Sequence, residues 1–265
     1  MKIESLKLIY FSPTGTTKTI IEGIARGFKH NPVEKIDITK SEVRKQQLQT
    51  SENDLLVIGV PVYVGRVPTI AIDWLYTLQA RSTPAVCIVV YGNRAYDDAL
   101  LELKDTMVKH GCVPVACAAF VGEHSFSSSE TPIAVARPDV SDVNLAELLG
   151  KRIKEKLLPI ASVDHISDIA VPGNYPYQEF KPWVLDFIEI DNNCSQCGVC
   201  ATVCPVDAID LENSALIEKE KCILCCACVK SCPEKALTVK PGIVKDVAKR
   251  LSQICQNRKE PVFFL

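Results

Sequence analysis

Residues 194–205 read CSQCGVCATVCP, and residues 222–233 read CILCCACVKSCP. Both stretches fit the spacing C-x2-C-x2-C-x3-C-P, so they form an internal repeat. Nine of the 13 cysteines of the chain fall within these two stretches. Disulfides are rare in reducing compartments, and such crowding is instead typical of metal binding. The remaining cysteines are scattered, and we expect them to be small buried apolar residues: Cys87, Cys112, Cys117 and Cys255.

The spacing of the repeat predicts two [4Fe–4S] clusters. Three thiolates wrap the chain around one cluster, and the fourth faces away on the next helical turn and ligates the other cluster. The first cluster is expected on Cys194, Cys197, Cys200 and Cys232, and the second on Cys222, Cys225, Cys228 and Cys204. A pair of zinc sites is the alternative, but zinc sites use CxxC pairs separated by longer loops.

The segment from about Trp183 to Lys240 resembles the bacterial two-cluster ferredoxins. This resemblance implies a small α+β domain with low-potential, one-electron chemistry. Nine acidic residues against five lysines make the segment acidic, which fits either docking on a basic redox partner or an ordinary solvated surface. Cys226 lies between two expected ligands and is either a non-ligating loop residue or a redox-active thiol.

The first 160 residues alternate buried, β-prone stretches with helical patterns. Strands are expected at 5–11, 34–39, 54–60, 84–92 and 113–122, and helices at 14–30, 68–80, 97–110 and 140–158. This alternation predicts an α/β domain with a parallel sheet covered on both faces. Ligands of such sheets bind at the carboxyl ends of the strands, near the point where the strand order reverses.

The loop after the first strand contains Ser12, Pro13, Thr14, Gly15, Thr16 and Thr17 and opens directly into a helix. Hydroxyls and backbone N–H groups at a helix N-terminus form an anion site. The loop fits neither the Walker pattern nor G-x-G-x-x-G. It resembles the phosphate loop of flavodoxins, which implies a doubly wound, five-stranded parallel sheet of order 2-1-3-4-5 and an FMN cofactor.

Two further loops lie at the same edge of such a sheet, and in flavodoxins they clamp the isoalloxazine ring. The first clamp residues are Pro61, Val62, Tyr63, Val64 and Gly65, and the second are Tyr91, Gly92, Asn93, Arg94 and Tyr96. Tyr63 and Tyr96 are expected to stack on the ring, and Arg94 to favour a negatively charged flavin. Tyr91 in the core and Arg94 as a solvated charge are the plain alternatives. A loop after the fifth strand carries His124, either near the flavin or as a surface histidine.

We divide the chain into a flavodoxin-like domain (1–160), a linker (161–182), a ferredoxin domain (183–240), and a C-terminal helix and tail (241–265). The proline-rich linker is expected to form an extended strap. The apolar end, residues 261–265, is expected to be buried within the chain or against another one.

The whole chain resembles the fused flavodoxin–ferredoxin proteins of anaerobes. The resemblance implies electron transfer between FMN and two clusters, linking one- and two-electron redox partner proteins; a reductase of a small-molecule acceptor is the alternative. Charge is nearly balanced, 30 Lys+Arg against 32 Asp+Glu, which argues against a nucleic-acid partner. No apolar run is long enough to span a membrane, and the N-terminus is not typical of a signal peptide. We therefore expect a cytoplasmic monomer or homodimer.

Overall fold

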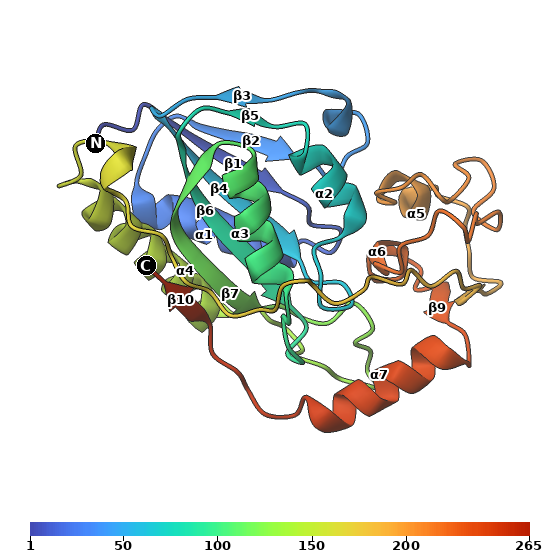
Figure 1. Ribbon diagram of the computed structural model, residues 1–265. Helices are drawn as coiled ribbons and strands as arrows, with labels where there is room; N and C mark the ends of the chain where they lie inside the picture. The colour runs from blue at the N-terminus through green and yellow to red at the C-terminus, as the bar shows by residue number, and fades with distance from the viewer.

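The computed structural model describes residues 1–265, and its first part is a doubly wound α/β domain (Figure 1). The central sheet has six strands in the order β10-β7-β6-β4-β1-β2. Its parallel strands are β1 (Ser5–Tyr10), β2 (Val33–Asp37), β4 (Asp54–Pro61), β6 (Thr83–Tyr91) and β7 (Cys112–Val121). Along the sheet these five strands follow the 2-1-3-4-5 order expected from the sequence.

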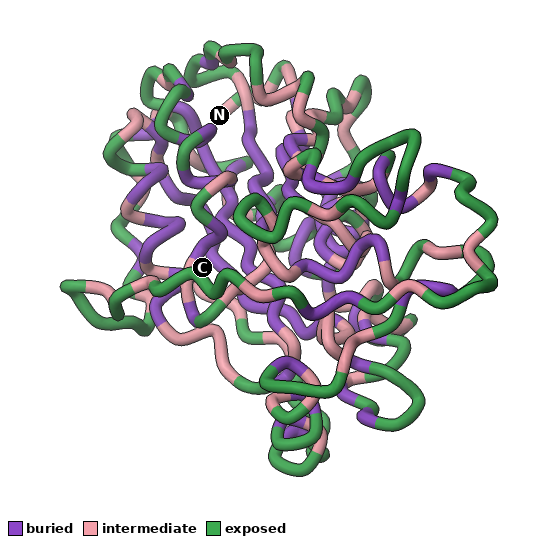
Figure 2. The backbone as a smooth tube through the Cα atoms, turned by 90° about the vertical axis from the view of Figure 1, so that its right-hand side faces the viewer, coloured by how far each residue is buried: buried purple, intermediate pink, exposed green.

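Helices cover both faces of the sheet. Helices α1 (Thr16–Phe28) and α4 (Val140–Leu157) pack on one face, and α2 (Thr69–Leu75) and α3 (Ala99–Lys109) on the other. Strand β6 is buried at every position, as a parallel strand between two helical layers must be. Buried backbone accordingly concentrates in the sheet (Figure 2).

The predicted helix over 68–80 is shorter in the structure. It ends at Leu75, and Gln79–Ala80 (β5) instead pairs in parallel with Gln49–Thr50 (β3) in a second, small sheet. The single helical turn Val43–Lys45 precedes β3. Backbone pairing with a distant strand overrode the local helical pattern.

The C-terminal end of the chain corrects the prediction of a five-stranded, fully parallel sheet. Val262–Phe264 (β10) pairs antiparallel with β7, and the Phe263 ring lies 5.5 Å from that of Phe120. The apolar tail thus packs on its own chain, where Phe263 and Phe264 are half-buried while Val262 and Leu265 stay exposed. It covers the edge of β7, which would otherwise present unpaired backbone groups.

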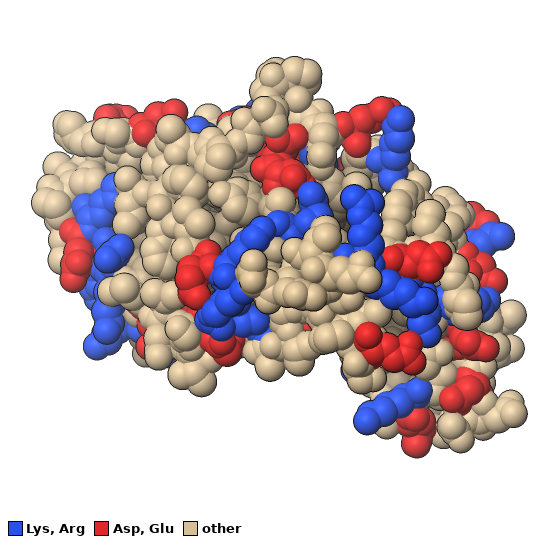
Figure 3. Space-filling model, turned by 90° about the horizontal axis from the view of Figure 1, so that it is seen from below, with Lys and Arg blue, Asp and Glu red and all other residues tan.

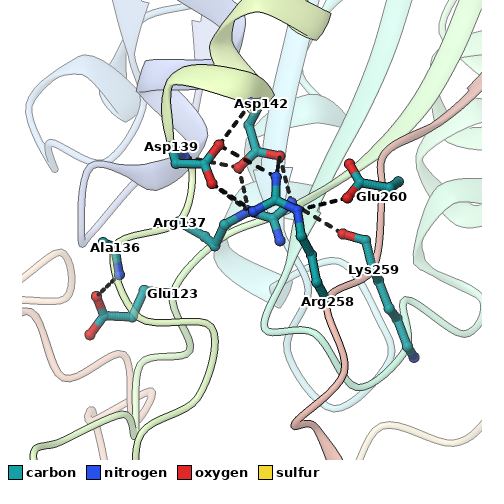
Figure 4. Close-up of polar contacts among 8 residues, drawn as sticks. All are labelled: Glu123, Ala136, Arg137, Asp139, Asp142, Arg258, Lys259 and Glu260. Atoms are coloured by element: carbon teal, nitrogen blue, oxygen red, sulfur yellow. Dashed lines mark hydrogen bonds and ion pairs between the residues drawn. The ribbon is translucent and has the colours of Figure 1, made fainter.

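A cluster of ionic contacts holds the tail in place (Figure 4). Arg137 is buried and pairs with Asp142 at the start of α4, and it also donates to the Lys259 carbonyl at 3.1 Å. Arg258 Nη1 donates to Asp139 at 2.6 Å, which holds the pKa of Asp139 well below its usual range. Tail and helix terminus are therefore joined by charge-assisted hydrogen bonds.

The second part of the chain is a small α+β domain. Strands β8 (Ile188–Ile190) and β9 (Leu237–Val239) pair antiparallel, and short helices α5 (Val199–Thr202) and α6 (Ala227–Ser231) follow the cysteine loops. The two loops repeat their backbone conformation: positive φ recurs at Gln196 and Leu224, Gly198 and Cys226, and Asp207 and Lys235. Helix α7 (Ile243–Ile254) leads from this domain back to the sheet.

The segment over 161–182 is extended, with one helical turn at Val163–His165, and it is tied to the first domain along α3. Lys104 donates to the Ile169 carbonyl at 2.9 Å, and Asp98 accepts the backbone N–H groups of Asn174 and Gln178 at 2.8 and 2.7 Å. The linker is thus a pinned strap and has a defined path. No helix of the chain is both long and apolar enough to cross a membrane.

Candidate flavin and iron–sulfur sites

A pocket lies at the carboxyl ends of β1, β4, β6 and β7, where the strand order reverses. Ten of its lining residues were predicted from the sequence: Ser12, Pro13, Thr14, Thr16, Thr17, Pro61, Val62, Tyr63, Tyr91 and Gly92. The structure therefore brings the three predicted loops together around one space.

The loop at the start of α1 is built to receive an anion. Ser12 Oγ accepts the Lys18 N–H at 3.1 Å, and Gly15 adopts a φ of +84° with open space around it. Thr17 lines the pocket, and its hydroxyl is fully buried and has no hydrogen-bond partner. Since buried polar groups are nearly always paired, this orphaned hydroxyl fits a phosphate oxygen. The N-terminus of the 13-residue helix adds a favourable dipole.

The loop after β4 forms a tight turn that projects Tyr63 into the pocket wall. Tyr63 and Arg66 exchange backbone hydrogen bonds of 2.9 and 3.0 Å, and Val64 and Gly65 between them have positive φ. Arg66 is fixed by Glu102 at 2.6 Å. Val64 and Gly65 shape this turn but do not line the pocket.

The loop after β6 contributes less than expected. Asn93 is buried and donates to the carbonyls of Cys255 and Asn257 at 2.8 and 2.9 Å, so its side chain serves the C-terminal segment. Arg94 pairs with Asp97, and the Tyr96 ring packs edge-on against Tyr91 at 5.4 Å. Asn93, Arg94 and Tyr96 lie outside the lining of the pocket.

A fourth wall comes from the loop after β7. Four residues of this loop line the pocket: Gly122, Glu123, His124 and Ser125. His124 thus lies at the pocket, the first of its two alternatives, whereas the other three residues and Val90 of β6 were not predicted. The His124 ring lies against Gly92, where an added Cβ would come within 2.3 Å. Burial, helped by Lys230 and Arg94, lowers the pKa of His124 to about 4, and its Nδ1 accepts the Phe126 N–H. The long polar stretch after the fifth strand was the available signal for this wall.

The eight predicted cluster ligands divide between two cavities of the small domain. One cavity is lined by Cys194, Cys197, Cys200 and Cys232, and the other by Cys204, Cys222, Cys225 and Cys228. Each fourth cysteine thus lies with the triplet of the other loop. All thirteen cysteines are free.

The cysteine surroundings fit bound clusters. Burial raises the pKa of Cys228 to about 12, so this thiol needs a bound metal to exist as a thiolate. The Ala208 N–H donates to Cys204 Sγ at 3.3 Å, the kind of contact that tunes cluster potential. The buried hydroxyl of Ser214, a residue missed from the sequence, accepts from Cys200 Sγ at 3.3 Å.

The spacing of the motif does not make Cys226 a ninth ligand, and its thiol is not accessible. It is buried, and burial raises its pKa well above the usual value. It occupies the repeat position of Gly198 with the same positive φ. The structure therefore favours the non-ligating loop residue over the redox-active thiol.

A groove of about 560 Å³ lies on the small domain, apart from the flavin pocket. It runs beside β8 and is lined by apolar residues together with Asp186, Glu189, Lys219, Glu220 and Lys240. Charges of both signs are likewise interspersed at this end of the molecule in Figure 3, whereas Lys and Arg gather across the middle of that face.

Family models match both parts of the chain. Residues 7–127 match the flavodoxin domain, and residues 188–210 and 215–238 match the 4Fe-4S binding domain. The chain therefore joins a flavodoxin domain to a ferredoxin-type domain, as in fused flavodoxin–ferredoxin proteins. The first implies FMN, and the two motifs of the second imply two [4Fe–4S] clusters.

Curated relatives match short stretches of 49 to 60 residues. The putative electron transport protein YsaA of Escherichia coli (strain K12) is 45% identical over 49 residues, 17% of this chain and 31% of the relative. The polyferredoxin-like subunit of the aliphatic sulfonate oxidoreductase of Pyrococcus furiosus is 33% identical over 60 residues, 21% of this chain and 35% of the relative. The chain spans about a third or less of the length of the curated relatives it matches.

Solved flavodoxins match the first domain. A flavodoxin from the domain Archaea is 16% identical with a TM-score of 0.39, covering 61% of this chain and 99% of that chain. The Fusobacterium nucleatum flavodoxin bound to flavin mononucleotide is 16% identical with a TM-score of 0.34, covering 58% of this chain and 95% of that chain.

Proposed function

We propose that this chain carries electrons between FMN and two [4Fe–4S] clusters, linking one- and two-electron redox partner proteins. FMN exchanges electrons singly or in pairs, and each cluster exchanges one at a time. The residues 12–17 would hold the phosphate, Tyr63, Tyr91 and Gly92 would border the ring, and the eight cysteines would hold the clusters.

The observation that carries this proposal is the contact between the cluster domain and the rim of the flavin pocket. Lys230, within the second cysteine motif, pairs with Glu123 of the pocket wall at 2.7 Å. Phe126, three residues further along the same loop, packs against the apolar core of the cluster domain. Electron transfer within one chain requires such proximity, and a fixed contact provides it without an encounter step.

A cofactor and acceptor experiment tests the proposal. The full chain is reconstituted anaerobically with FMN, iron and sulfide, and its flavin and iron contents are measured after gel filtration. It is then reduced with a low-potential donor and offered ferredoxin-dependent enzymes and a panel of small acceptors. Rapid reoxidation by proteins alone supports a carrier, whereas turnover of a small acceptor supports the reductase. A purified holoprotein without flavin refutes the proposal.

A further inference from the structure

The two cysteine cavities are not equivalent in their relation to the flavin pocket. The cavity of the second cluster lies on the side of the small domain that faces the sheet. Arg44 Nη2 donates to the carbonyl of Pro205, next to Cys204, at 2.5 Å. Helix α6, which carries Cys228, also carries Lys230, whose ammonium pairs with Glu123 of the flavin-pocket wall at 2.7 Å.

Tyr63 is the pocket residue placed toward the loop of the second cluster. It lines the flavin pocket and packs against the apolar core of the large domain. Ile223 of the same loop packs against the apolar cluster of the large domain that Tyr63 also contacts. Tyr63 and the loop of the second cluster thus meet on the same apolar core of the large domain.

The first cluster faces outward. Cys197 is exposed, whereas Cys225 and Cys228 of the second cluster are buried. Leu211 is 66% exposed and lies over the Gly198 turn of the same loop, 3.2 Å from an ideal Cβ at that position. The first cluster thus has one ligand, Cys197, at the surface. No ligand of the second cluster is exposed, and Cys222 is the one that borders the surface groove beside β8.

We propose that electrons follow one route, from the flavin pocket past Tyr63 to the second cluster, then to the first cluster, and from its exposed Cys197 edge to the redox partner. Every step moves a single electron, oxidising one centre and reducing the next, so two passages balance the two-electron change of the flavin. The route is reversible, and it rests on the proposed function.

The test uses a laser flash to photoreduce the flavin of the reconstituted full chain. The rate at which the cluster absorbance then bleaches is measured. Flavin and iron contents are measured first, so absence of a cofactor exposes a failure of the proposed function before any flash. Tyr63→Leu is expected to slow the bleaching while retaining both cofactors, and Tyr63→Phe to restore it because it keeps the aromatic ring. Equal rates in all three proteins would refute a role for this side chain.

Ligand variants test the order of the clusters. Cys222→Ser is expected to lose the fast bleaching, although EPR still detects the first cluster. Cys197→Ser is expected to keep the fast bleaching but to lose rapid reduction of an added one-electron protein acceptor, with cytochrome c as the probe. The opposite pattern, with fast bleaching lost only in Cys197→Ser, would overturn the proposed order while leaving the function standing.

Discussion

Replacing Thr17 with valine tests the phosphate site with opposite effects on binding and stability. The hydroxyl is fully buried and unpartnered, which costs about 1–3 kcal/mol of stability in the protein without ligand. A hydrogen bond from it to the charged phosphate is worth about 1.5–3 kcal/mol. Thr17→Val is therefore expected to raise the Kd for FMN about 10- to 100-fold. It is also expected to leave the apoprotein equally stable, or more stable by about 1 kcal/mol.

The affinity is measured by quenching of flavin fluorescence, with FMN and riboflavin as the two ligands. Riboflavin lacks the phosphate, so its Kd is expected to stay unchanged in Thr17→Val. Stability of the apoprotein is measured by urea unfolding. Thr19→Val is the matched control on the same helix, since its hydroxyl already donates to the Gly15 carbonyl at 3.1 Å and lies outside the pocket lining.

Two results would contradict the reasoning. An unchanged FMN Kd would show that the Thr17 hydroxyl does not contact the phosphate. Equal losses of FMN and riboflavin binding, together with a less stable apoprotein, would show that the substitution damages the loop and that the phosphate plays no special part.

Three further predictions concern groups around the pocket. His124 stays neutral in the folded protein down to about pH 4, whereas the unfolded chain protonates it near pH 6.5. The free energy of unfolding should therefore fall by about 3 kcal/mol as the pH is lowered from 6.5 to 4. Urea unfolding at several pH values measures this fall, which should be smaller in His124→Gln. Asp98→Ala leaves the strap N–H groups of Asn174 and Gln178 without their acceptor, so we expect a loss of about 2–4 kcal/mol and faster proteolysis of the strap. Lys230→Met removes the half-buried ion pair with Glu123 at the domain contact, and it should lower the free energy of unfolding by about 1 kcal/mol, and by less at high salt. Urea unfolding at two salt concentrations measures this loss.

Features set by local chain geometry could be predicted from the sequence. The cysteine spacing fixes how each loop wraps, and the structure accordingly places Cys232 with the first triplet and Cys204 with the second. The Ser12–Thr17 loop is equally local, because its conformation follows from a strand, a glycine and a helix N-terminus. The alternation of buried, β-prone stretches with helical patterns likewise predicted the five parallel strands of the sheet.

Features that join distant parts of the chain could not be predicted in this way. Asn93 was expected at the flavin because its loop follows β6. Its side-chain amide instead donates hydrogen bonds to residues more than 160 positions away in the chain. Strand β10 has three residues, too few to show a period, and its pairing with β7 depends on the path of α7. Nor does local sequence show that Lys230 and Phe126 join the cluster domain to the rim of the flavin pocket, since this depends on how the domains dock.

The docking itself follows from two anchored connections. The chain enters the cluster domain through the strap, which is pinned to α3, and leaves it through α7 and a tail that pairs with β7. A domain tethered at one end by a flexible linker samples many positions, and its effective concentration at the flavin depends on linker length. A domain held at both ends loses most of that freedom already on folding. The weak polar contact at Lys230 and the packing of Phe126 and Ile223 then need only to set its orientation, because the two connections have set its place.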